Sequence, residues 1–586
     1  MPVENVKNKS EIKTSKANLW AVLIPYKWQI ALLVVLTIIS NGFNLAVPKL
    51  ISRAVDAFGA GSFVASSFVW QFLAIALFIF IFTYFQSLVQ TYAAERVARD
   101  LRTKLIDKIS TQEFQYIQEV TPNKLLTNLT SDVDAVKMFV SMAISSIVSS
   151  AFLIVGASIL LLLIDWELGL AILVAVPIIF ATFFIVMSKV RKLFRKSQEA
   201  IDWLNKVINE SVLGSALIRL LNSQHYEYEK FLAANTRARD VSLSILRLFA
   251  TLIPVITFAT NLSTLVILAL GGHFVITGAI SLGDFTAFNS YLAILIFPII
   301  IIGFMSNLIA FASAAYQRIY EVLSVEEKIN TGKITAQLHG NLAVKNVTVK
   351  YGEKSALKNI SFDVKAGTKI AIIGPTAAGK TQLLYLLIGL LKPTTGSIEY
   401  DGKNISEYNP VALHNQIGFV FQDSIIFNAS LRENIGFSNT VKDEDLEKAI
   451  TTAELKDFVE TFPEKLGTVV SERGTSLSGG QKQRIMLARA LALNPKILLL
   501  DDFTARVDTN TEQKILKNIS INYPDLTLIS VTQKIAAIEN YDQVLVLMEG
   551  ELLAIGTHAT LMHSSPEYVQ IYNSQQSTNE YELRPE

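Results

Sequence analysis

The chain has 586 residues, of which 51% are hydrophobic and only 18% are charged, a composition too apolar for an ordinary soluble protein. Its length predicts two or more domains, and its composition predicts that one of them lies in a membrane. The net charge of +1 gives no reason to expect a nucleic-acid partner, and the lack of cysteine excludes disulfides, thiol catalysis and cysteine-ligated metals.

Runs without basic residues divide the first half of the chain. No Lys or Arg occurs at 54–95, 138–188 or 248–317, and a shorter run of this kind precedes them at 28–48. These runs are long enough to predict six membrane-spanning helices, near 27–55, 66–96, 138–164, 167–190, 248–274 and 283–316.

The turns between the predicted spans indicate their orientation. Those at 59–61, 165–167 and 277–279 contain no Lys or Arg, which predicts that they face away from the cytoplasm and that both chain ends are cytoplasmic. Lys49 and Arg53, near the outer end of the first span, are exceptions to this pattern.

Long charged stretches at 96–137 and 189–247 separate the spans. Their helical periodicity predicts that the membrane helices continue into the cytoplasm as stalks, which turn near 114–124 and near 223–230. A separately folded cytoplasmic insert is the alternative, but neither stretch shows strand signals.

The predicted spans contain no cluster of charged residues, so any substrate pathway through them is expected to be apolar. Their isolated amide side chains either form hydrogen bonds within the helix bundle or line that pathway; they are Gln86, Gln90, Asn261, Asn289 and Asn307.

The sequence changes character after Glu321. Short β-rich runs at 342–349, 360–364, 370–373 and 497–500 alternate with helical segments, which predicts an α/β nucleotide-binding domain. The predicted organisation is a cytoplasmic N-terminus with an interfacial elbow helix (1–26), a six-helix transmembrane domain (27–322), a linker (323–338), the α/β domain (339–575) and a disordered tail (576–586).

A phosphate-binding loop is predicted at 374–381, between an apolar strand and the start of a helix. Glycines at both ends let the backbone turn its N–H groups toward phosphate, while Lys380 supplies a positive charge and Thr381 a hydroxyl for Mg²⁺. The predicted loop residues are Gly374, Pro375, Thr376, Ala377, Ala378, Gly379, Lys380, Thr381 and Gln382.

Two further patterns extend this prediction. Asp501 ends an apolar strand, where a carboxylate can lie beside the phosphate loop and hold Mg²⁺ through water. Ser478, Gly479, Gly480 and Gln481 open another helix and form a second phosphate-binding terminus. One nucleotide cannot use both termini of a single monomer, so the simplest geometry is a head-to-tail dimer in which each 478–481 segment closes the other subunit's site.

With these motifs the chain resembles an ATP-binding cassette exporter half-transporter over nearly its whole length. Residues 477–481 match the family signature Leu-Ser-Gly-Gly-Gln without change. The resemblance implies that Tyr351 stacks on adenine and that Gln422 contacts Mg²⁺ and couples to the membrane domain. It further implies that 471–474 contact the partner's stalk turns and that Asp508 belongs to a dimer-interface loop.

Three positions depart from the family pattern. Asp502 stands where the family has a glutamate that polarises the attacking water, Gln533 replaces a switch histidine, and Arg506 replaces a small residue. Asp is one methylene shorter than Glu, and a misplacement of about 1 Å can cost about 100-fold in rate. Gln533 can donate a hydrogen bond but cannot titrate. This pattern resembles the degenerate-site subunit of heterodimeric bacterial exporters.

The sequence therefore predicts export of amphipathic, drug-like or lipid-like compounds, driven by ATP with Mg²⁺, by one half of a dimer in the bacterial inner membrane. A heterodimer with a second half-transporter is favoured over a homodimer, and membrane lipids and a hydrophobic small-molecule, lipid or peptide substrate are the other expected partners. The predicted catalytic residues are Asp502, Gln533 and Gln422, and the predicted Mg²⁺ ligands are Thr381, Gln422 and Asp501.

Other functions fit parts of this pattern. An active homodimeric exporter, an ATP-gated channel and a regulatory subunit remain alternatives, the last two because the catalytic positions are altered. An importer is disfavoured, because importers of the family that this chain resembles usually carry their membrane and ATPase parts on separate chains.

Overall fold

The computed structural model describes residues 18–326, 332–437, 441–471 and 474–582. The chain divides into two compact units. The helical unit holds the described residues up to Thr111 and those from Val120 to Glu326, and the α/β unit holds Gln112–Glu119 and the described residues after Glu326.

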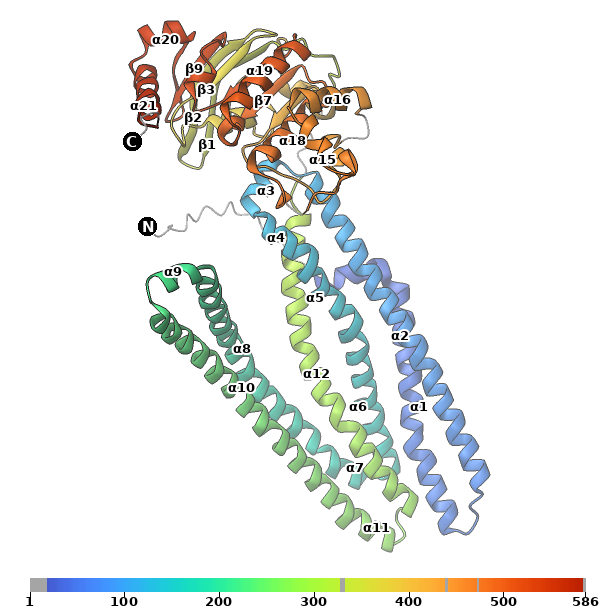
Figure 1. Ribbon diagram of the computed structural model, residues 1–586. Coiled ribbons are helices and arrows are strands. Elements are labelled where there is room, and N and C mark those ends of the chain that lie inside the picture. The colour runs from blue at the N-terminus through green and yellow to red at the C-terminus, as the bar shows by residue number, and fades with distance from the viewer. Residues whose placement is uncertain (1–17, 327–331, 438–440, 472–473, 583–586) are drawn as a thin grey trace. The chain divides into compact units, whose positions relative to one another are not determined.

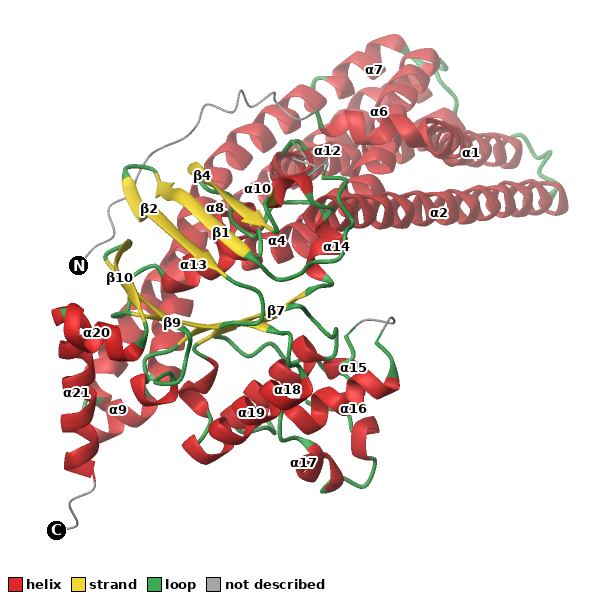
Figure 2. Ribbon diagram, turned by 90° about the horizontal axis from the view of Figure 1, so that it is seen from above, coloured by secondary structure: helices red, strands yellow, loops and turns green. Residues whose placement is uncertain are grey.

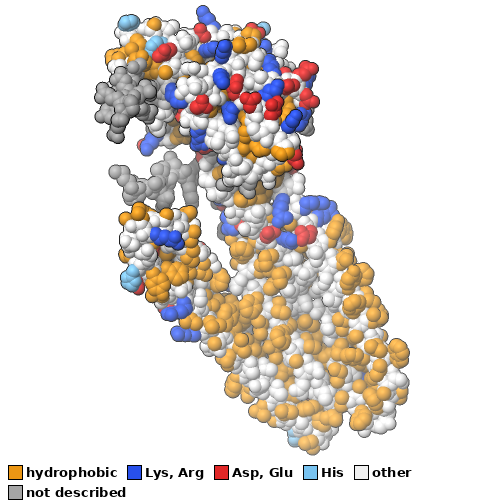
Figure 3. Space-filling view, in the orientation of Figure 1, with side chains coloured by type: hydrophobic (Ala, Val, Ile, Leu, Met, Phe, Trp, Pro, Cys, Tyr) orange, Lys and Arg blue, Asp and Glu red, His pale blue; other side chains and the backbone are white. Residues whose placement is uncertain are grey.

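The helical unit contains six helical spans that are long and apolar enough to cross a membrane, as the sequence predicts (Figure 1). Hydrophobic side chains cover most of the face of this unit that Figure 3 shows, as expected for a surface in contact with lipid. Its α-helices are α1 (Lys27–Gly59), α2 (Ala65–Ser110), α4 (Pro122–Thr127), α5 (Val133–Met138), α6 (Ile144–Ile164), α7 (Trp166–Leu173), α8 (Ala175–Leu213), α9 (Ser215–Leu220), α10 (Gln224–Val266), α11 (Gly272–Ile276) and α12 (Leu282–Leu323).

The membrane helices continue well beyond their apolar runs. In α2 the apolar positions Val97, Leu101 and Leu105 recur at helical spacing and are buried, so the stalk predicted there is a packed helix. Between α8 and α10 the chain reverses at residues 214–223. The interval 223–230, expected to hold this turn, instead forms the start of α10, because Asn222 takes the left-handed conformation (φ 52°) that ends the reversal.

Charged side chains near the outer turn of α1 are paired. The Lys49 ammonium lies 2.9 Å from a carboxylate oxygen of Asp284. Asp56 accepts hydrogen bonds from the hydroxyl of Ser281 and the N–H of Gly283, both at 2.7 Å. These contacts give Lys49 a counter-ion, which explains how a basic residue is accommodated at the outer end of this span.

Two sheets form the α/β unit (Figure 2). The smaller sheet has the order β2-β1-β4-β5 and antiparallel neighbours, and the larger has the order β10-β9-β3-β8-β7-β6, with parallel pairing except between β9 and β10. The strands are β1 (Leu342–Tyr351), β2 (Lys354–Val364), β3 (Lys369–Ile373), β4 (Thr395–Tyr400), β5 (Lys403–Asn404), β6 (Ile417–Val420), β7 (Ile497–Asp501), β8 (Thr527–Val531), β9 (Gln543–Met548) and β10 (Glu551–Gly556). The α-helices are α3 (Phe114–Val120), α13 (Lys380–Leu387), α14 (Pro410–His414), α15 (Leu431–Ile435), α16 (Asp443–Thr452), α17 (Lys456–Glu460), α18 (Gly479–Leu491), α19 (Thr509–Asn522), α20 (His558–Ser564) and α21 (Pro566–Glu582).

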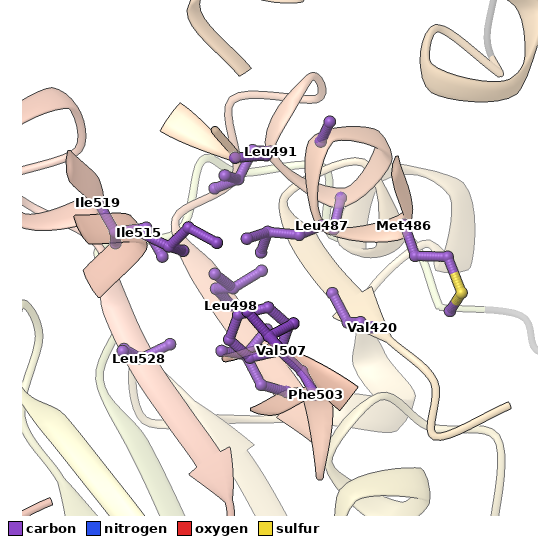
Figure 4. Close-up of a cluster of buried hydrophobic side chains, with 14 of the residues drawn as sticks. Val420, Met486, Leu487, Leu491, Leu498, Phe503, Val507, Ile515, Ile519 and Leu528 are labelled. Carbon is purple, nitrogen blue, oxygen red and sulfur yellow. The ribbon is translucent and has the colours of Figure 1, made fainter. Parts of the chain in front are cut away.

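Both faces of the larger sheet are buried, which is why its strands β3 and β7 are continuous apolar runs. On β7, Ile497 and Leu499 belong to the core shared with α13 and the smaller sheet, whereas Leu498 and Leu500 face the opposite core. Figure 4 shows Leu498 among side chains of α18 and α19, the helices that cover this second face. The two cores hold the carboxyl ends of the parallel strands in fixed positions.

The ends of the chain differ in part from the expected forms. The predicted elbow helix is a 3-10 helix, η1 (Leu19–Tyr26), and residues 1–17 lie outside the described part. Helix α21 continues to Glu582, so the described part of the predicted disordered tail is helical.

Candidate functional site

The loop between β3 and α13 has a backbone that requires glycine at both ends. Gly374 has φ 152° and Gly379 has φ 97°. A Cβ on Gly374 would lie 2.0 Å from the carbonyl oxygen of Leu547, and a Cβ on Gly379 would lie 2.9 Å from that of Ala356. No side chain caps the N-terminus of α13. The loop therefore presents an uncapped helix start, the arrangement that binds phosphate groups.

Lys380 is the first residue of α13, and its side chain folds over the loop. Its ammonium donates to the carbonyl oxygens of Gly374 and Pro375, both at 2.8 Å. Burial lowers the pKa of this ammonium, while the nearby carboxylates of Asp502 and Asp501 act in the opposite direction. The positive charge thus lies at the loop, where it can meet phosphate oxygens.

Asp501 ends β7 and faces the start of α13. Its Oδ1 accepts a hydrogen bond from the Thr381 hydroxyl at 3.2 Å, while its buried Oδ2 has no hydrogen-bond partner among the described residues. Burial raises the pKa of this carboxyl, and the neighbouring carboxylate of Asp502 adds to the rise. An unpaired buried carboxylate oxygen beside a hydroxyl fits a Mg²⁺ ion, which prefers oxygen ligands and would offset the cost of burial.

These groups line one cavity of about 530 Å³. The structure brings Gln422, Asp502 and Gln533 to the same cavity as Asp501 and the loop residues 376–382. Separate predictions from four distant segments thus converge on one place; their chemical roles remain predictions. Five lining residues were not foreseen: Ser355, Ala356, Val531, Glu549 and Gly550.

The two altered positions are held by the carboxyl ends of β7 and β8. Asp502 has a left-handed backbone (φ 47°), and its N–H donates to the carbonyl of Val531 at 3.0 Å. Burial raises the pKa of the Asp502 carboxyl, against the attraction of Lys380 and Lys534. Gln533 is the second residue after β8, so both side chains follow neighbouring strands of the larger sheet.

Side chains from two helices support the loop that carries Gln533. Gln575 of α21 donates to the carbonyl of Gln533 and accepts from the N–H of Ile535 at 3.0 Å. The Lys534 ammonium donates to the carbonyl of Thr504 at 3.2 Å and lies 3.6 Å from Glu512 of α19, whose side chain is 2% exposed. The predicted end of the domain at residue 575 thus falls on a residue that contacts this loop.

The predicted residues outside the cavity lining include Gly374 and Pro375 at the start of the loop, and also Tyr351 and Asp508. The hydroxyl of Tyr351 donates to the side chain of Gln382 at 2.8 Å, and the Tyr351 side chain remains partly exposed. Asp508 caps α19 by accepting from the N–H of Thr511 at 3.0 Å, and this hydrogen bond lowers the pKa of the Asp508 carboxyl. A structural role is therefore visible for Asp508, and an adenine-stacking role for Tyr351 remains a prediction.

The signature segment forms a capping box at the start of α18. The Ser478 hydroxyl accepts from the N–H of Gln481, and the Gln481 side chain accepts from the N–H of Ser478. The stem of Arg506 lies against Gly479, where an added Cβ would be 3.1 Å from Arg506 Cδ. None of Ser478–Gln481 is among the described residues that line the cavity. In the 471–474 segment, Glu472 and Arg473 lie outside the described residues.

Comparisons with known proteins agree with this architecture. Residues 30–299 match the family model described as ABC transporter transmembrane region. Residues 357–505 match a second family model, described as ABC transporter. The chain is 32% identical to an uncharacterised ABC transporter ATP-binding protein, YfiB of Bacillus subtilis, over 94% of this chain and 97% of the relative. It is 30% identical to the probable multidrug resistance ABC transporter ATP-binding/permease protein YheI of the same species, over 93% and 94% of the two chains.

The fold also matches a solved structure. A bacterial Atm1-family ABC exporter with ATP bound superposes with a TM-score of 0.78, at 23% sequence identity, over 95% of this chain and 99% of that chain. The chain thus belongs to the ABC transporter family, as a multi-pass membrane exporter of the half-transporter type with fused transmembrane and ATP-binding domains.

Proposed function

We propose that this chain is the degenerate-site half of a heterodimeric exporter that moves amphipathic, drug-like or lipid-like compounds across the bacterial cell membrane. Its own cavity binds ATP with Mg²⁺ but hydrolyses it slowly, and its signature segment completes the site of a second half-transporter. The observation that carries the proposal is the pair of altered side chains, Asp502 and Gln533, in the same cavity as the phosphate loop.

Binding is assigned to groups that keep the family pattern. The loop N–H groups and the Lys380 ammonium hold the phosphates, and Asp501, Thr381 and Gln422 supply oxygen ligands for Mg²⁺. Held by these residues, Mg²⁺ would supply positive charge to offset the negative charge that develops on the outer phosphate oxygens. Tyr351, next to Gln382, supplies the aromatic ring for the adenine.

Hydrolysis is assigned to the altered groups. Asp502 reaches one methylene less far than a glutamate would, and loss of a general base costs about 10²- to 10⁴-fold in rate. Gln533 can donate a hydrogen bond to an outer phosphate oxygen, but it cannot carry a positive charge.

A second subunit is needed because the two phosphate-binding termini of this domain serve different sites. The signature residues Ser478–Gln481 are intact in sequence yet lie outside the lining of their own cavity. A head-to-tail partner brings each signature to the opposite nucleotide. The drug-like substrate class is supported by the relative named as a probable multidrug resistance transporter.

The direct test compares ATP hydrolysis by the purified wild-type chain with that of the double variant Asp502→Glu, Gln533→His. We expect the double variant to hydrolyse ATP about 100-fold faster, since it restores the reach and charge of the family residues. Adding Lys380→Met to the double variant should abolish the gain. A wild-type rate as fast as that of an active double variant would show that Asp502 suffices and that a homodimer is competent.

Pairing needs a separate measurement. Affinity purification of this chain from its native membrane should recover a second, different half-transporter in equal amount, with Glu and His at the altered positions. Recovery of this chain alone, in a dimer that drives export in vesicles, contradicts the heterodimer. Vesicle flux that only dissipates a gradient would favour a channel instead.

A further inference from the structure

The helical unit contains a cavity of about 600 Å³ between α1, α2, α6 and α12. This volume is within the range of sites that bind small molecules. The polar residues that line it are Asn44, Gln86, Ser145, Ser146, Ser149 and Ser150. The sequence predicts an apolar substrate pathway, whereas the wall of this cavity carries amide and hydroxyl groups beside its apolar side chains.

Two glutamines one helical turn apart on α2 have different environments. Gln90 donates to the carbonyl of Ser141 and so joins α2 to the neighbouring helical segment. Gln86 lines the cavity, and no hydrogen bond engages its side chain within the described part of the chain. Because an unpaired amide in an apolar setting is costly, Gln86 is a group that a bound molecule can satisfy.

The opposite wall adds an acceptor and the apolar surface. Pro298 lies within α12, and a proline has no N–H to bond the carbonyl of Ile294 four residues earlier. Ile294 and Pro298 both line the cavity, together with the large apolar side chains of Phe297 and Ile301. One face of α12 thus offers both a carbonyl oxygen and a surface for a hydrocarbon or aromatic group.

The cavity is electrically neutral. No Lys, Arg, Asp or Glu is among the described residues that line it. Two charged side chains of α1 beyond the cavity already have partners: Lys49 pairs with Asp284, and Asp56 accepts hydrogen bonds from Ser281 and Gly283. A charged ligand would lose its hydration here without gaining a counter-ion, which is strongly unfavourable in a membrane interior.

We propose that this cavity binds an uncharged amphipathic molecule. Gln86 and the serine hydroxyls of α6 bond its hydroxyl- or amide-bearing head group, and Phe297 and Ile301 contact its apolar part. The site would select against lipophilic cations and fatty-acid anions of the same chain length. This inference rests on the proposed export function only in taking the bound molecule to be cargo.

The test uses the full chain in phosphatidylcholine nanodiscs with tritiated monoolein as the probe. Unlabelled monoolein, oleoylcholine and oleate, which share one hydrocarbon chain and differ in head-group charge, compete for binding. We expect monoolein to displace the label at concentrations at least tenfold lower than either charged compound. Displacement by oleoylcholine or oleate at equal or lower concentrations would overturn the proposal.

Two matched variants locate the site. Gln86→Leu should weaken monoolein binding about tenfold, the effect of losing one or two hydrogen bonds, whereas Gln90→Leu on the same helix should leave it unchanged. Equal effects of both variants would overturn the assignment. The competition series on the wild-type chain decides the charge preference even where a variant fails to fold.

Failure of the proposed binding site and failure of the proposed function give different results. ATP-driven export of a cationic dye without monoolein binding would contradict the neutral binding site but support the exporter. Monoolein binding that depends on Gln86, in a chain that supports no export, would support the binding site but contradict its role in transport.

Discussion

The two walls of the ATP cavity are held in place by different kinds of contact. The loop wall, residues 374–382, is fixed by close backbone approaches, with Gly374 against the carbonyl of Leu547 and Gly379 against that of Ala356. The switch wall, formed by Asp501, Asp502 and Gln533, is supported by side chains of α19 and α21.

This difference shows how binding and hydrolysis can diverge within one site. A backbone that accepts only glycine at two positions leaves little room for change, so the loop wall keeps its pattern. Asp502 and Gln533 can be exchanged for other side chains while Lys534 and Gln575 still hold the loop around them. The site can therefore retain nucleotide while its chemistry changes.

The largest effect is expected from Lys534→Met. This change leaves Glu512, which is 2% exposed, without its cation at 3.6 Å. Loss of one partner of a fully buried pair costs about 3–5 kcal/mol, and the partial exposure of Lys534 reduces the expected loss of unfolding free energy to about 2–3 kcal/mol. Chemical denaturation of the detergent-solubilised chain measures it.

The pH dependence provides the control for Lys534→Met. Burial already raises the pKa of Glu512. When the pKa of an acid is higher in the folded chain than in the unfolded chain, stability falls as the pH rises from the unfolded-state pKa through the folded-state pKa. The loss of unfolding free energy caused by Lys534→Met should therefore become smaller as the pH is lowered. Adding Glu512→Gln to the Lys534→Met chain should remove this loss at neutral pH. An equal deficit with and without Glu512 would contradict the ion-pair explanation.

On the loop wall, Lys380→Met should weaken ATP binding about 10- to 100-fold without lowering stability. The reason is the loss of a charge-assisted contact to phosphate, worth about 1.5–3 kcal/mol. Binding of a fluorescent ATP analogue measures the change. Lys403→Met on the exposed strand β5 serves as the control, and equal affinities of the two variants would be inconsistent with Lys380 acting at the phosphates.

Much of the fold could be predicted because its signals are local. Runs free of Lys and Arg indicate the six spans, and the apolar runs of β3 and β7 indicate strands buried on both faces. The loop motif, Asp501 and Gln533 each stand at the end of a strand, so the meeting of strand ends in a parallel sheet brings them together.

The remaining features depend on contacts between distant segments. Glu549 and Gly550 form a turn between β9 and β10, and only the pairing of β9 with β3 places them at the cavity. Gln86 and Gln90 look equivalent in the sequence, yet only the packing of α2 against its neighbours distinguishes the bonded amide from the cavity-facing one.

The smallest effect concerns the contact of α21 with the switch wall. Gln575→Ala removes two hydrogen bonds, one of them to the N–H of Ile535 at 3.0 Å. Each neutral bond contributes about 1 kcal/mol, so the Ile535 amide should exchange with solvent deuterium about fivefold faster, while ATP affinity stays unchanged. Amide hydrogen exchange over 532–537 measures this. Gln570→Ala, on the same helix, is the matched control, because no hydrogen bond joins Gln570 to this loop within the described part of the chain.

The hydrogen bonds of Gln575 go to backbone atoms of the loop, so its loss should act equally on the wild-type chain and on a Gln533→His variant. If the change in amide exchange caused by Gln575→Ala depends on the side chain at 533, then Gln575 of α21 interacts with that side chain and not only with the backbone of the loop.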